Sequence, residues 1–137
     1  MINFLKSLFA AKPQTEVAPQ PMPTDLPPSL LDGLETQITV IKKVATEEEK
    51  TVLDQLLLAV QQDDLASVAK HFHKISQLSR DWHLENAGIL MSARINKMLK
   101  EKESGLIDAE KLKLERNVLI DSLSRGIGNI AEVLKQR

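Results

Sequence analysis

The sequence predicts an all-α fold, a small bundle of about five helices that follows a flexible proline-rich tether. All six prolines lie at or before Pro28, and the 137-residue chain has only five glycines. Aromatic residues make up 3% of the chain, and Leu, Ile, Val, Ala, Lys and Glu dominate after Ser29, a composition typical of helices. Apolar residues there recur at spacings of three and four, the period of a helix with one buried face.

Size, charge and cysteine content narrow the classes of protein that the chain can belong to. A mass of 15.3 kDa suits one domain. Eighteen basic and nineteen acidic residues leave a formal net charge of -1, which argues against a general nucleic-acid binder. Without cysteine the chain has no disulfide, thiolate metal site or cysteine nucleophile. We therefore expect a protein of a reducing compartment, the cytoplasm.

Residues 1–11 are expected to be a short amphipathic segment. Their apolar side chains lie at helical spacing: Ile2, Phe4, Leu5, Leu8 and Phe9. The segment is too short to cross a bilayer, which takes about 20 apolar residues. One interpretation is a loose terminus lying on the domain. The other is a docking element for a protein partner or, weakly, for the periphery of the inner membrane.

The Pro-rich stretch over 12–28 is predicted to be a linker, because proline removes backbone donors and favours extended chain. The helical domain then covers 29–137. Its first helix is expected over about 29–45. Thr46 and Glu49 form a capping-box pattern that begins a second helix, which runs to about Gln62. Asp63 or Asp64 is positioned to cap a third, from Leu65 to about Leu78.

The fourth helix, predicted over about 82–103 with Asp81 as its cap, has apolar residues on two sides. One stripe consists of Leu84, Ala87, Met91, Ile95 and Met98. A second stripe consists of Trp82, Ile89 and Ala93. A helix that is apolar on two faces is expected to pack between neighbours.

Two turn signals separate the fourth helix from the fifth. Gly105 suits the left-handed position after a helix end, and Asp108 is placed to cap the next helix. The fifth helix contains Gly126 and Gly128 inside its apolar pattern. Each glycine weakens a helix by roughly 1 kcal/mol relative to alanine, so we expect a kink or break near them.

The segment from Asn86 to Leu123 resembles the effector-associated domain family of prokaryotic conflict and signalling proteins. The shared pattern is an Asn, an aliphatic run, an Arg and an Asn, with a Gly eleven positions after the Arg. An aliphatic pair, a capping acid and a Glu-x-Asn follow. The matching positions here are Asn86, Arg94, Asn96, Gly105, Asp108, Glu115 and Asn117. The resemblance covers about 52–125.

The resemblance implies an all-α adaptor without catalysis. Domains of this family are thought to connect effectors such as proteases, nucleases and TIR modules to nucleotide-switch or receptor proteins. Like domains pair with like, so the implied partners are proteins with similar helical domains, including further copies of the chain. No catalytic residue, cofactor or metal site is predicted.

The polar residues of the shared pattern have two interpretations. In the first they are structural: Arg94 and Glu115 bridge the fourth and fifth helices, and Asn96 is partly buried with a hydrogen-bond partner. In the second, some of them belong to a surface that faces a partner.

Two alternative functions remain at this point. The sequence around His73 loosely resembles a histidine phosphotransfer motif, although Lys74 follows the histidine directly and Ser76 holds the position where a lysine is expected. His71 and His73 lie two apart on one helix and point about 200° apart, so they are not expected to share a metal. The other alternative is a small helical accessory protein of a secretion system or a phage.

Overall fold

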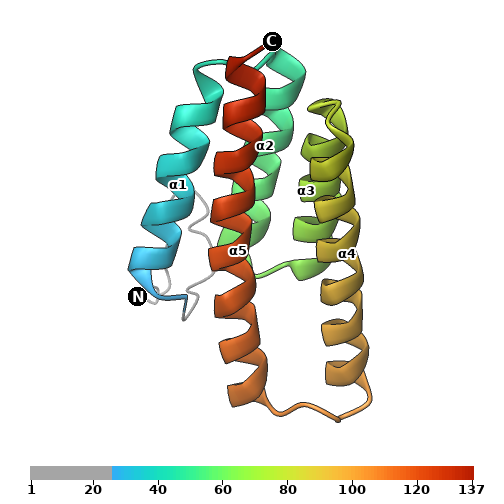
Figure 1. The fold of residues 1–137 in the computed structure, drawn as a ribbon. Coiled ribbons are helices and arrows are strands. Elements are labelled where there is room, and N and C mark those ends of the chain that lie inside the picture. The colour runs from blue at the N-terminus through green and yellow to red at the C-terminus, as the bar shows by residue number, and fades with distance from the viewer. Residues whose placement is uncertain (1–25) are drawn as a thin grey trace, which may run out of the picture.

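The computed structural model describes residues 26–137, which form five helices and no strand. The helices are α1 (Pro28–Lys42), α2 (Glu47–Gln61), α3 (Leu65–Leu78), α4 (Trp82–Glu103) and α5 (Ala109–Lys135). They run alongside one another, and the all-α bundle is confirmed (Figure 1). The predictions for residues 1–11 and for most of the Pro-rich tether lie outside the described residues.

The order of the helices in space places α4 at one edge of the bundle. α1 packs against α5 and α2, α2 packs against α3, and α3 packs against α4. α4 lies at the edge opposite α1, and the ends of α4 and α5 that meet at the connecting turn extend beyond the other helices (Figure 1). Of the five described helices, α3 and to a lesser extent α5 are the neighbours of α4, and both lie on the same side of it (Figure 1).

One hydrophobic core holds the five helices together. All five contribute, and the largest of its fully buried side chains are Phe72, Leu34, Ile41, Leu53, Leu56, Ile75, Ile95, Leu119, Ile120, Leu123, Ile127 and Ile130. Burial of a side chain of this size contributes about 1.5–3 kcal/mol. The apolar periodicity in the sequence thus identifies most of the core.

Side-chain caps begin four of the helices where the sequence predicts them. Thr46 accepts a hydrogen bond from the Glu49 amide, and the Glu49 carboxylate accepts one from the Thr46 amide. Asp64, Asp81 and Asp108 cap α3, α4 and α5, and each accepts a hydrogen bond from the amide three residues further on. These caps satisfy amides that have no partner within the helix.

The limits of α1 differ from the prediction. The helix begins at Pro28, inside the expected linker, and ends at Lys42 instead of near residue 45. Proline is well suited to the first helical turn because its missing amide hydrogen would have no acceptor there. At the other end, Thr46 must be extended to cap α2, so the chain leaves the helical conformation before it.

The expected break in α5 is absent, because the helix continues through both glycines to Lys135. Gly126 instead allows a close contact between helices. A Cβ at this position would lie 2.8 Å from Cζ of the buried Phe72 ring. The glycine therefore makes room for the aromatic side chain in the core.

Gly88 likewise allows a close contact between helices, in this case between α3 and α4. A Cβ there would lie 2.9 Å from Ser76 Oγ and 3.3 Å from the Cα of His73. Ser76 is fully buried and donates a hydrogen bond to the Phe72 carbonyl, so its side chain is held in place. Glycine at position 88 thus sets how closely α4 approaches α3.

We predict that Gly88→Ala destabilises the fold by about 1–3 kcal/mol, because the added methyl group overpacks this contact. Gly33→Ala is the matched control: Gly33 lies in α1 with open space around it, so alanine should stabilise the protein by up to about 1 kcal/mol. Urea unfolding followed by circular dichroism measures both. Equal effects of the two variants would contradict the close approach.

An ion pair between the exposed Arg137, just after α5, and the buried Glu49 joins the end of the bundle to the start of α2. Arg137 donates from Nη1 to Glu49 Oε2 at 2.8 Å and from Nη2 to Oε1 at 2.6 Å, and Nη2 also donates to the Val44 carbonyl. Glu49 is only 3% exposed. The Arg137 guanidinium lowers the pKa of the Glu49 carboxyl below its ordinary value, with burial opposing this shift.

We predict that Arg137→Ala lowers the free energy of unfolding by about 1–3 kcal/mol at neutral pH, because it leaves a buried carboxylate without its cation. The folded-state pKa of Glu49 is lowered, so the contribution is present above the unfolded pKa and is lost as pH falls through the folded one. The difference between wild type and variant in urea unfolding should therefore shrink in acid. Lys135→Ala, which breaks only an exposed pair with Glu132, should cost less than about 1 kcal/mol.

Candidate functional site

α4 is buried on one side only, and the prediction that it packs between neighbours on two sides is wrong. Ile95 and Met98 of the first stripe are buried. The second stripe is open to solvent: Trp82 is 66% exposed and Ile89 47% exposed. Among the helices of residues 26–137, none packs on that side of α4.

Among the exposed residues of α4, seven lie along one side of the helix, and we call this side the outer face of α4. Its members are Trp82, Asn86, Ile89, Leu90, Ala93, Asn96 and Lys100, all of them exposed. Leu90 is 69% exposed, and the Trp82 ring stacks at 3.8 Å on the neighbouring His83 ring, which leaves most of the indole open. Ala87, expected in the core, is also exposed, and Gly88 takes the core position beside it.

Two residues of the family pattern, Asn86 and Asn96, lie on this outer face. Asn96 is exposed, so the prediction that it is partly buried is wrong. Arg94 is exposed as well, and among the described ion pairs none joins it to Glu115, which is partly exposed on α5. The expected bridge between the two helices is therefore not formed.

The turn between α4 and α5 is built as the sequence predicts. Gly105 has a φ of 74°, in the left-handed region that favours glycine, and follows the end of α4. Asp108 accepts a hydrogen bond of 2.8 Å from the Lys111 amide at the start of α5. These two residues of the family pattern are structural.

The last residue of the pattern, Asn117, supports a buried arginine that the sequence analysis missed. Arg116 is 4% exposed and donates to Asn117 Oδ1 from Nη2 at 3.0 Å and from Nε at 3.3 Å. Its Nη1 lies 3.4 Å from Oδ2 of Asp63, in the turn between α2 and α3. Position 116 falls on the apolar face of α5, four residues after Leu112 and three before Leu119, which is the signal that could have revealed it.

His71 and His73 line a hollow of about 540 Å³ together with Val52 and Gln55 of α2. Within residues 26–137, His73 Nε2 is enclosed and has no hydrogen-bond partner. This burial counts against the phosphotransfer interpretation. The pKa of His71 is lowered, mainly by burial and next by the nearby Lys70. Within residues 26–137 no group of three or more acidic or histidine side chains is placed to hold a metal.

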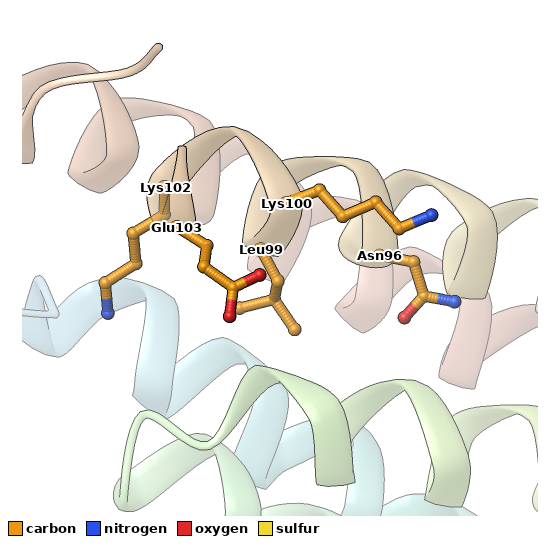
Figure 2. A pocket seen from close by; sticks show the side chains of 5 residues that line it. All are labelled: Asn96, Leu99, Lys100, Lys102 and Glu103. Carbon is orange, nitrogen blue, oxygen red and sulfur yellow. The ribbon is translucent and has the colours of Figure 1, made fainter. Parts of the chain in front are cut away.

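Another hollow, of similar size, lies beside the second half of α4. Its volume is about 550 Å³, and Figure 2 shows the residues that line it: Asn96, Leu99, Lys100, Lys102 and Glu103. These groups are a surface amide, two ammonium groups and a carboxylate beside one leucine, without a nucleophile among them. The hollow thus continues the outer face of α4 and does not resemble an active-site cleft.

The fold and this face define a small all-α domain whose candidate binding groups are exposed side chains on one helix. Residues 51–131 match the family model of effector-associated domain 11. This match covers more than half of the chain, so the chain belongs to the effector-associated domain family, as the resemblance implied. It includes α3 and α4, α2 from Thr51 onward and α5 up to Ala131, but not α1. Searches of curated proteins and of solved structures found no match.

We predict that Ile89→Asn changes the free energy of unfolding by less than about 0.5 kcal/mol, because the outer face is solvated in the free domain. Ile95→Asn, on the opposite side of the same helix, should cost more than about 3 kcal/mol because Ile95 is fully buried. Urea unfolding of the two variants is the measurement. A large loss for Ile89→Asn would mean that the outer face is covered within the chain.

Proposed function

We propose that the protein is a non-catalytic adaptor of a bacterial signalling or conflict system that recruits its partner through the outer face of α4. Membership of the effector-associated domain family supports the adaptor function. The exposed apolar side chains on a capped 22-residue helix support the choice of surface.

A single observation carries this proposal, the exposure of Trp82, Ile89 and Leu90 on one strip of a rigid helix. Contiguous apolar surface of this kind is typical of protein-interaction sites, and tryptophan is enriched among the residues that dominate binding. Gly88 holds α4 closely against α3, so the strip is preorganised. Little conformational freedom is lost when a partner binds to it.

The partner class that we propose is another helical domain of the same family. An apolar helix face is matched by a second helix face, which supplies apolar side chains at the same three- and four-residue spacing. Asn86 and Asn96 on the face supply amides that can pair across such an interface. The two residues then have the partner-facing role that was the second interpretation of the family pattern.

Contact with a membrane is a separate and weaker expectation. Among the described residues no helix combines the length and the hydropathy needed to cross a bilayer. The expected docking segment, Ile2 to Phe9, lies outside the described residues and stays a prediction. Co-sedimentation of the full chain with anionic vesicles, compared with a variant lacking residues 1–11, tests it.

The proposed function is tested by affinity capture from the native cell extract, with identification of the captured proteins and a repeat of the binding with the purified partner. We expect the wild-type chain to capture proteins that carry effector modules or similar helical domains. Ile89→Arg should lose them, because it places a charge at the centre of the apolar strip.

Val118→Arg is the matched control for this capture. Val118 is 53% exposed on α5, so the substitution adds the same charge to a different surface. Partners that are retained by Val118→Arg and lost by Ile89→Arg support the proposal. Loss with both variants, or with neither, would contradict the assignment of the outer face of α4.

A further inference from the structure

The hollow between α2 and α3 is a candidate binding site that the proposed function does not use. We call it the basic hollow, and it is lined by Val52 and Gln55 of α2 and by Lys70, His71, His73, Lys74 and Gln77 of α3. Its volume of about 540 Å³ lies within the range of small-molecule sites, roughly 300–1,000 Å³. Because α2 and α3 pack against each other in the core, the backbone on both sides of the hollow is held in place.

Phe72 fixes the position of the basic residues on α3. Its ring is 2% exposed and packs in the core, and the sequence on either side of it is symmetrical, Lys-His-Phe-His-Lys over 70–74. At 100° per residue, Lys70 and Lys74 lie one helical turn apart on the side of α3 that faces away from the core. The two histidines lie at the margins, between the lysines and the core, so the helix presents four basic groups around one stretch of surface.

The residues that line the basic hollow include no carboxylate to balance its cations. They supply two ammonium groups, two imidazoles and the amides of two glutamines. Within residues 26–137 neither Lys70 nor Lys74 takes part in an ion pair, whereas Lys42 and Lys50 do. The positive charge acts on His71, whose pKa is lowered by burial and next by Lys70.

Three acidic residues lie towards the margins of the basic hollow. Asp64 accepts hydrogen bonds from the Ser67 amide at 3.3 Å and from its hydroxyl at 2.7 Å. Glu85 of α4 accepts one of 3.4 Å from Gln77 Nε2. Glu48 lies one helical turn before Val52 on α2 and does not line the hollow. These carboxylates flank the hollow and leave an excess of positive charge within it.

His73 adds a polar atom that the fold itself does not satisfy. Its Nε2 is enclosed and has no hydrogen-bond partner among the described residues. Buried polar atoms in this state are rare in folded domains. No hydrogen bond at Nε2 therefore opposes a turn of the imidazole ring towards an acceptor in the hollow.

From this arrangement we propose that the basic hollow binds the phosphate group of a small phosphorylated molecule. A phosphate monoester carries a charge of about −1.5 to −2 at neutral pH and three strong acceptor oxygens. Two ammonium groups one helical turn apart balance such a charge, whereas a single carboxylate would leave one lysine uncompensated. The glutamine amides and the imidazoles supply further donors to the phosphate oxygens. Val52 and the apolar stems of the lysines contact the rest of the molecule.

Titration calorimetry of the full chain with glycerol 3-phosphate at low ionic strength tests this proposal. We expect saturable binding with a dissociation constant of about 1 mM or below, which is reasonable for a ligand of so few atoms. Glycerol, which lacks the phosphate group, should not bind. Absence of saturable binding of both glycerol 3-phosphate and inorganic phosphate to the wild type would overturn the proposal.

The double variant Lys70→Gln/Lys74→Gln should raise the dissociation constant at least tenfold, because both positive charges at the phosphate are removed. Both lysines are exposed, so the fold should tolerate the change. Lys97→Gln/Lys111→Gln is the matched control, since it removes two exposed lysines from α4 and α5. Equal loss with the two double variants would show attraction to the overall charge of the chain and would contradict a site in the hollow.

NMR spectra of the ¹⁵N-labelled chain locate the bound phosphate. Glycerol 3-phosphate should shift the backbone amide signals of residues 70–77 most strongly. The indole N–H signal of Trp82 should not move, because this chain's one tryptophan lies on the outer face of α4. Largest shifts at the capped helix starts instead would assign the binding to backbone amides and overturn the proposal.

A short peptide with one phosphoserine distinguishes a small molecule from a phosphorylated protein as the source of the phosphate. We expect the peptide to bind no more tightly than glycerol 3-phosphate, because the hollow is of small-molecule size. Much tighter binding of the peptide, lost in Lys70→Gln/Lys74→Gln, would make the ligand a phosphorylated protein and overturn the proposed class.

The outcomes separate this proposal from the adaptor function. Ile89→Arg should bind glycerol 3-phosphate as the wild type does, because Ile89 lies on the outer face of α4 and not in the hollow. Loss of phosphate binding with Ile89→Arg would contradict a separate site. Failure of the protein capture leaves the phosphate site standing, and failure of phosphate binding leaves the adaptor function standing.

Discussion

The close contact between α3 and α4 at Gly88 is the constraint on which the exposed face depends. With no side chain at this position, α4 lies directly against the buried Ser76 and the backbone of α3. This places Ile95 and Met98 in the core and turns the opposite side of the helix outward. A larger residue at position 88 would separate the helices and change the direction in which Trp82 and Ile89 point.

A second constraint orients the hairpin of α4 and α5. The buried Arg116 of α5 is held by Asn117 and lies near Asp63 in the turn between α2 and α3. Asp63 has a φ of 57°, a conformation that aspartate tolerates better than most residues. Burying a guanidinium without polar partners would lower the stability of the fold. The contact with Asp63 therefore favours the arrangement in which the turn between α2 and α3 packs against Arg116 of α5. The ion pair of Glu49 and Arg137 has the same effect at the other end of the bundle.

Local signals in the sequence predict most of this fold. The caps at Thr46, Asp64, Asp81 and Asp108, and the left-handed Gly105, depend on residues close to one another, so they could be identified from spacing. The continuity of α5 could not, because Gly126 accommodates the ring of Phe72, which is distant in sequence. Nor could the partners of Arg116, since Asp63 lies 53 positions away.

The outer face of α4 shows most clearly what periodicity can and cannot predict. Two apolar stripes on one helix indicate two contacts, but they do not say whether both contacts are made within the same chain. Among the five described helices only the first stripe packs against a neighbour, since α4 is an edge helix. The second stripe also contains polar residues: Asn86, Asn96 and Lys100. They limit the continuous apolar area that is exposed to water in the free domain. A stripe of this mixed composition is more suited to a reversible contact between molecules than to a permanent core.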